Sequence, residues 1–104
     1  MRLDKPWLPL EESQLERIGA QLGVFELGDE WGRVLYIGAA DGRSLFGLRG
    51  ELERRIGSAA RFRFEVNTAY ETRQQELLMV HFADNGRYPE LNTELETRGL
   101  GRLS

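Results

Sequence analysis

The sequence predicts a small α+β domain in which a short, mostly antiparallel sheet of three strands is flanked by helices. Two observations lead to this prediction. The chain has 104 residues, of which 40% are hydrophobic and 30% are charged, a composition that supports one folded core and is too apolar for disorder. Along the chain, apolar residues switch between helical spacings and strand-like runs, in the order helix, strand, strand, helix, strand, helix.

The first helix is expected from Leu10 to Leu22, after an extended lead-in that ends at Pro9. Within this range Leu15, Ile18 and Leu22 recur at spacings of three and four, which places them on one helical face. Glutamates occupy other faces and the first turn, where negative charge suits the helix dipole. The pattern predicts one apolar stripe that packs against the core.

A β-hairpin is predicted next, with strands over residues 23–27 and 33–38. The segment 28–32 between them reads Gly-Asp-Glu-Trp-Gly, a composition typical of turns. The second strand contains the uninterrupted apolar run 34–37, which is typical of a strand covered on both faces.

The second helix is expected after the loop 39–43, with Ser44 as its N-cap. Its apolar stripe consists of Leu45, Leu48, Leu52 and Ile56, and Gly57 follows it. Two glycines inside this range, Gly47 and Gly50, indicate either close packing or an irregular first turn.

Residues 61–67 alternate strictly between polar and apolar side chains, which predicts a third, half-buried strand. Thr68 and Glu71 then fit a capping box, so a helix should begin there and run to about Asp84. Its second half, 77–83, is apolar nearly all round and is expected to be buried.

The predicted domain covers residues 1–92, and its last segment is a loop that contains Pro89. The polar tail 93–104 carries glycines and is expected to fray.

The composition limits the functional classes. The chain has no cysteine, which excludes disulfides and cysteine-bound metals and favours a reducing, cytoplasmic setting. No window is apolar enough to span a bilayer, and the first ten residues do not resemble a signal peptide. The single histidine excludes a multi-histidine metal site.

The net charge of −3 is unfavourable for a protein that binds nucleic acid. The charge is unevenly spread, however, because six arginines and only two glutamates lie between Arg43 and Arg63. An arginine-rich run suits phosphate recognition, and it is equally consistent with a solvated surface.

Short motifs on the predicted elements carry the functional signal. Gly23-Val24-Phe25 opens the first strand of the hairpin, and Tyr36-Ile37-Gly38 closes the second. A helix with Arg49 follows, Glu76 lies on the last helix, and Asn92 comes shortly after it. Over about residues 22–92 this arrangement resembles the GIY-YIG endonuclease superfamily, including the nuclease domain of nucleotide-excision repair and its small stand-alone relatives.

The resemblance implies a role for each matched residue. Glu76 would bind a single divalent metal, Mg or Mn, and Tyr36 would act near the attacking water. Arg49 would contact the scissile phosphate. Arg43 is a second candidate, because the loop before Arg49 is longer than in typical members. Asn92 matches the structural asparagine that follows the helix, and it borders the expected substrate site with Phe25 and Arg43.

Phe25 departs from the family pattern, because the first motif normally ends in tyrosine and phenylalanine has no hydroxyl. Two functional hypotheses follow. In the first, another group such as Tyr36, Tyr70 or His81 replaces the hydroxyl, and the domain is a metal-dependent endonuclease acting on DNA more readily than on RNA. In the second, the domain has lost catalysis and binds nucleic acid or a protein partner. The sequence leaves the oligomeric state open.

Each candidate also has a structural interpretation. Glu76 lies three residues after Arg73 and Arg49 lies four before Glu53, spacings that form ordinary ion pairs along a helix. Tyr36, in an apolar strand, fits a buried tyrosine with a bonded hydroxyl. His81 fits a core or boundary residue. Trp7 and Trp31 could stack on bases, although Trp7 fits packing better.

Overall fold

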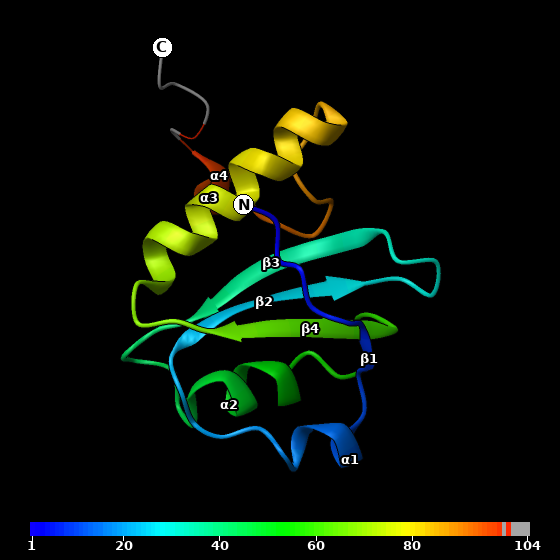
Figure 1. Cartoon of the computed structure of the whole chain (residues 1–104), viewed down its shortest axis with the longest axis vertical. Helices are drawn as coiled ribbons and strands as arrows, with labels where there is room; N and C mark the ends of the chain where they lie inside the picture. The colour runs from blue at the N-terminus through cyan, green and yellow to red at the C-terminus, as the bar shows by residue number, and fades with distance from the viewer. Residues whose placement is uncertain (99, 101–104) are drawn as a thin grey trace.

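A computed structural model of the chain describes residues 1–98 and 100. Its centre is one antiparallel sheet of four strands in the order β1-β4-β2-β3, which Figure 1 shows nearly edge-on between two layers of helices. The strands are β1 (Leu8–Pro9), β2 (Gly23–Gly28), β3 (Val34–Ala40) and β4 (Arg61–Val66). The α+β class and the three expected strands are confirmed. The three-strand count was wrong, because the two-residue β1 pairs with the start of β4.

The predicted hairpin is formed by β2 and β3. Its register runs from Gly23 opposite Ala40 to Leu27 opposite Tyr36. The Asp29 carboxylate closes the turn by accepting hydrogen bonds from the backbone amides of Trp31 at 2.9 Å and Arg33 at 2.8 Å. The hairpin thus forms where the turn residues predicted it.

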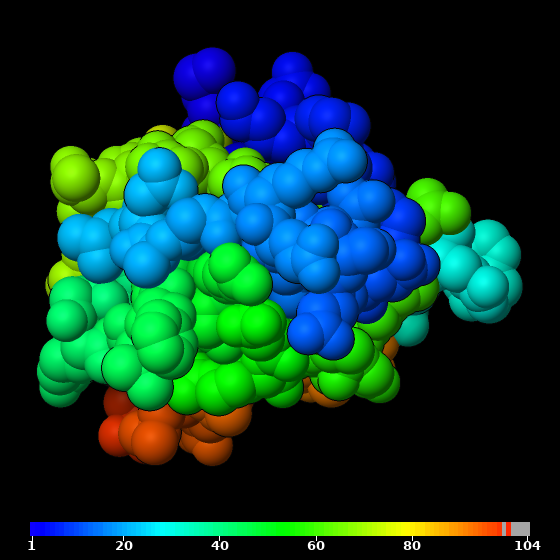
Figure 2. All heavy atoms as spheres, turned by 90° about the horizontal axis from the view of Figure 1, so that it is seen from below, coloured from blue at the N-terminus to red at the C-terminus, as the bar shows by residue number. Residues whose placement is uncertain are grey.

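The two faces of the sheet carry separate cores, because successive side chains of a strand point to opposite faces. On β2, Phe25 and Leu27 pack with Leu48 and Leu52 on the face that holds α1 and α2. Val24 and Ile37 pack on the other face against Leu77 and Leu78 of α3, together with Leu3 of the N-terminal segment. Figure 2 shows the first face from below, where the blue segment before β2 and the green α2 lie side by side.

The helix expected over 10–22 is much shorter than predicted. Only Glu12–Leu15 forms a helix, α1, although Leu15 and Ile18 are buried as expected. The carbonyl of Gln21 instead accepts a hydrogen bond from the Leu48 amide, and the carbonyl of Leu22 accepts one from Asn67. The backbone carbonyls at the end of this segment therefore bond other elements and do not continue a helix.

The second helix, α2 (Gly47–Glu53), also begins later than Ser44. Phe46 adopts a left-handed conformation with φ of 62°, which interrupts a helix before Gly47. The Ser44 hydroxyl accepts from the Asp41 amide at 3.0 Å and does not cap the helix. Leu48 and Leu52 are buried as predicted, but Leu45 is exposed.

The long helix α3 (Tyr70–Asn85) ends as predicted, at a left-handed Gly86. Its expected capping box was wrong: the N-cap is Ala69, whose amide donates to the Asn67 side chain at 2.8 Å. Burial was overestimated as well. Only Leu77 and Leu78 of α3 are buried, because the helix packs against a single face of the sheet.

The segment after Asn92 was expected to fray, but Glu94–Thr97 forms a short helix, α4. Thr93 and Glu96 make a capping box in which each side chain bonds the other residue's backbone amide. The rest of the predicted tail, residues 99 and 101–104, lies outside the described residues. Within the described part of the chain, every helix is too short or too polar to cross a membrane.

Candidate functional site

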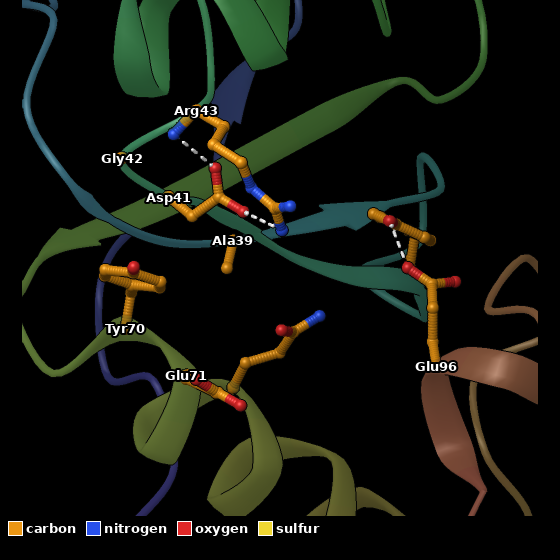
Figure 3. Close-up of a pocket in the computed structure, with 9 residues that line it drawn as sticks. Ala39, Asp41, Gly42, Arg43, Tyr70, Glu71 and Glu96 are labelled. Carbon is orange, nitrogen blue, oxygen red and sulfur yellow. Dashed lines mark hydrogen bonds and ion pairs between the residues drawn. The ribbon is translucent and has the colours of Figure 1, made fainter.

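A cleft of about 470 Å³ lies at the outer edge of β3 (Figure 3). Tyr36 and Ala39 belong to β3, and the loop 41–43 that follows the strand forms one wall. The first two turns of α3 form another wall, and Glu96 of α4 completes the lining. The α3 residues are Tyr70, Glu71 and Gln74. Because β3 is an edge strand, this cleft is open to solvent along the sheet.

Tyr36 holds its hydroxyl in place between two side chains. The hydroxyl donates to Glu96 Oε2 at 2.6 Å and accepts from Arg55 Nη2 at 3.2 Å, while the Arg55 guanidinium lies 4.3 Å from the ring centre. Burial and the bond to Glu96 raise the pKa of Tyr36 to about 12. The phenol therefore stays protonated at neutral pH, where it is a hydrogen-bond donor and a poor base.

Phe25 lies beside Tyr36 in the core and does not reach the solvent. The two ring centres are 5.9 Å apart. Gly38 makes this packing feasible, since a Cβ atom there would lie 2.5 Å from Phe25 Cζ and 2.5 Å from the Tyr36 ring. The glycine of the Tyr-Ile-Gly motif thus has a structural reason, which is the close approach of two aromatic rings.

Arg43 shares the cleft with Tyr36. Its side chain is 95% exposed and contacts Asp41 Oδ2 only at 3.6 Å. The backbone amide of Arg43 donates to Asp41 Oδ1 at 2.8 Å, and this bond is the main cause of the lowered pKa of Asp41. The guanidinium is therefore available to a ligand.

Arg49 lies elsewhere. It is on α2, 4.0 Å from Glu53, as the helical spacing predicts. It lines a separate hollow formed by α2, Phe46 and residues 18–20 before β2. The structure therefore does not bring Arg49 and Tyr36 to one cleft.

Glu76 also lies apart, on a part of α3 that does not line the cleft. Its carboxylate pairs with Arg73, as the i,i+3 spacing predicts, and lies 3.3 Å from the N-terminal amine. The hydrogen bond from Arg73 is the first cause of the lowered pKa of Glu76. Both carboxylate oxygens thus already face cations. Within the described residues, no three Asp, Glu or His side chains are grouped closely enough to hold a metal ion.

Asn92 closes part of the β3 edge. Its side-chain oxygen accepts from the Ile37 amide at 2.9 Å, and its amide nitrogen donates to the Ile37 carbonyl at 2.9 Å. The neighbouring Leu91 amide donates to the Leu35 carbonyl at 3.0 Å. The Asn92 side chain thus takes the place of a paired strand next to the cleft.

The remaining candidates lie in four different places. Tyr70 lines the cleft, whereas His81 lies on α3 with Nδ1 2.9 Å from the Arg87 carbonyl oxygen. Trp31 is exposed at the hairpin turn. Trp7 packs over Gly28 and is covered by the Arg63 guanidinium at 4.1 Å, in keeping with the packing role preferred for it.

Of the six predicted site residues, the cleft contains Tyr36 and Arg43, while Asn92 bonds Ile37, the β3 residue next to Tyr36. Sequence reasoning missed Glu96 and Gln74, and it considered Glu71 only as a cap. A signal for Glu96 was present, because Thr93 and Glu96 have the capping-box spacing that predicts an ordered helix.

Comparison with known protein families assigns the chain to one of them. Residues 1–84 match the model of a family described as a domain of unknown function (DUF7508), and the chain belongs to that family. The match includes most of the residues that line the cleft but ends before Asn92 and Glu96. The search of curated proteins gave no match.

Proposed function

We propose that this chain is a GIY-YIG-like domain that binds a partner through the cleft at the β3 edge and does not cleave phosphodiesters. One observation supports the proposed loss of catalysis: Tyr36, Arg49 and Glu76 lie in three separate places in the molecule. The hairpin, the helix after it, β4 and α3 follow one another in the order that the family resemblance implies. This order supports the fold assignment.

The chemistry explains why separation matters. Hydrolysis of a phosphodiester needs positive charge at the phosphate and a positioned nucleophile, all within hydrogen-bonding or coordination reach of one atom. Glu76 is neutralised by Arg73, and the Tyr36 hydroxyl is already bonded on both sides. Phe25 supplies no hydroxyl and is buried. These residues support a binding role better than a catalytic one.

A metal-dependent endonuclease is the second candidate, and one observation favours it. Tyr36 and Arg43 line the same cleft as the carboxylate of Glu71. An active enzyme would therefore contact phosphate through Arg43 in place of Arg49. It would need Mg or Mn, which neutralises charge on the phosphate when bound. In either case we place the domain in the cytoplasm. A chain without cysteines needs no disulfide, so a reducing compartment suits it.

The test is cleavage of supercoiled plasmid and of labelled RNA with Mg or Mn. We expect no cleavage by the wild-type protein, by Glu76→Gln or by Arg43→Ala. A known metal-dependent nuclease, which should cleave both substrates, is the positive control. Cleavage by the wild type that is lost in Glu76→Gln or Arg43→Ala would overturn the proposal and establish the endonuclease.

Phe25→Tyr gives a second, independent arm. The new hydroxyl would have to fit where the ring already lies against Gly38, so we expect lower stability and no gain of activity. Metal-dependent cleavage by this variant would mean that only the hydroxyl was missing.

A further inference from the structure

The outer edge of β3 is closed along part of its length and open at the cleft. In an antiparallel strand, the amide and carbonyl of every second residue point to the same edge. At the outer edge these residues are Leu35, Ile37 and Ala39, because Leu91 bonds Leu35 and Asn92 bonds Ile37 from that side. Ala39 is next in this series, and it lines the cleft.

Residues 91–92 of the same chain thus bond the outward backbone groups of Leu35 and Ile37. The outward backbone groups of Ala39 face the cleft. Within the described residues, no hydrogen bond joins the Ala39 amide or carbonyl to the segment that covers Leu35 and Ile37. An unpaired amide and carbonyl at a strand edge form a ready site for the backbone of another extended chain. The volume of about 470 Å³ lies within the range of ligand pockets.

The charges in the cleft determine which chain would suit it. Three carboxylates line it, those of Asp41, Glu71 and Glu96, against the single guanidinium of Arg43. The Arg43 side chain lies toward Asp41, as Figure 3 shows, while Glu71 is on the opposite wall. Hydrogen bonding keeps the pKa of Asp41 low, so this carboxylate is ionised at neutral pH. Such a cleft attracts cationic side chains and repels phosphate.

We propose that the cleft captures an extended, basic segment of a partner protein. The segment adds backbone hydrogen bonds to Ala39 and presents a lysine or arginine to Glu71. Tyr70 supplies an aromatic wall for the aliphatic part or the charge of that side chain. The inference rests on the proposed function, since it names the partner class of the same cleft.

The test uses two fluorescein-labelled heptapeptides, one alternating threonine with arginine and one alternating threonine with glutamate. Threonine favours the extended conformation, and the two peptides carry opposite charges on the same alternating pattern. Fluorescence anisotropy should show binding of the arginine peptide at least about tenfold tighter than that of the glutamate peptide, and weaker at higher salt.

Variants locate the binding. Glu71→Gln should weaken the arginine peptide about threefold and Glu71→Arg about tenfold, because both act on a solvent-facing ion pair. Glu30→Gln makes the same charge change in the hairpin turn, at the other end of β3, and should leave binding unchanged. Ala39→Pro removes the outward amide of this position and should weaken binding about fivefold. Circular dichroism checks that Ala39→Pro is folded. If this variant does not fold, the Glu71 variants decide the outcome.

Several outcomes would overturn the proposal: no binding of the arginine peptide, equal binding of the glutamate peptide, or indifference to both Glu71 variants. Salt-dependent binding of labelled DNA or RNA that requires Arg43, without cleavage, would also overturn it and leave the non-catalytic function intact. Metal-dependent cleavage would instead overturn the proposed function itself, so the two failures are distinguishable.

Discussion

The cleft beside β3 and the ion cluster around Arg73 both join α3 to distant parts of the chain, yet they satisfy their charges very differently. Arg73 is only 12% exposed, and its guanidinium bonds Glu65 at 2.9 Å, Glu76, and the Arg2 carbonyl at 3.2 Å. Arg43 is 95% exposed and has one loose contact with Asp41. The first arginine is fully used by the fold, and the second is open to solvent.

The comparison teaches which charges of this chain stabilise the fold and which are available for binding. A guanidinium held by several acceptors in a partly buried site fixes its neighbours, whereas an exposed, loosely paired one adds little stability. The glutamates of α3 divide in the same way. Glu71 and Glu76 are five positions apart, about 140° around a helix, so the helix sends them to different surroundings.

The largest expected effect comes from removing the closed arginine. Arg73→Ala should lower the free energy of unfolding by about 2–3 kcal/mol, because it leaves Glu65 without its main partner and releases the N-terminal segment. Urea denaturation followed by circular dichroism measures the change. The matched variant Arg43→Ala should stay within about 0.5 kcal/mol of the wild type. Equal losses in the two variants would remove the distinction between closed and open sites.

The next effect concerns the closed part of the β3 edge. Asn92→Ala should cost about 1–2 kcal/mol, because both the amide and the carbonyl of Ile37 lose a partner. Asn85→Ala is the control, since it removes one exposed bond to the His81 carbonyl at the end of α3 and should cost much less. A neutral Asn92→Ala would mean that water, together with the Gln74 side chain at the Ile37 carbonyl, satisfies this edge equally well, and Asn92 would not mark the boundary of the cleft.

A smaller effect is expected at Tyr36. Tyr36→Phe should cost about 1 kcal/mol at neutral pH, because the bonds to Glu96 and Arg55 are lost. Folding raises the pKa of this phenol from 10.0 to about 12, so its contribution is complete below pH 10 and declines as the pH rises toward 12. The difference in urea midpoint between the wild type and the variant should therefore be smaller at about pH 11 than at about pH 9. A constant difference would contradict the assigned environment of Tyr36.

The smallest expected change is in the acid dependence of the Arg73 cluster. The hydrogen bond from Arg73 lowers the pKa of Glu65 below its usual 4.5. A carboxyl with a depressed pKa stabilises the fold above its unfolded pKa and loses this contribution as the pH falls through its folded pKa. The difference in stability between the wild type and Arg73→Ala should thus shrink below about pH 4.5, whereas the difference for Asn92→Ala should not. Urea titrations at several acidic pH values measure both, and a pH-independent Arg73→Ala difference would exclude Glu65 as the titrating partner.

The two capping-box patterns in the chain illustrate how far local sequence leads. Thr68 with Glu71 and Thr93 with Glu96 have the same spacing, yet only the second pair forms the box. At the first, the Asn67 side chain accepts the Ala69 amide and moves the helix start past Thr68. At the second, Glu96 is also held by the Tyr36 hydroxyl. A tertiary contact thus accompanies the pattern that formed.

Sequence alone determined the α+β class, the hairpin and the position of α3, because turn residues, alternation and a terminal glycine act over a few neighbouring residues. It also provided the ion pairs within helices, which depend only on spacing. Only the tertiary structure decided which candidates meet. Alternation sends Tyr36 and Ile37 to opposite faces of the sheet, and the packing of α2 and α3 on those faces separates Arg49 from Glu76. The cleft at β3 depends on contacts between residues far apart in the chain, such as Tyr36 with Glu96, which no local pattern specifies.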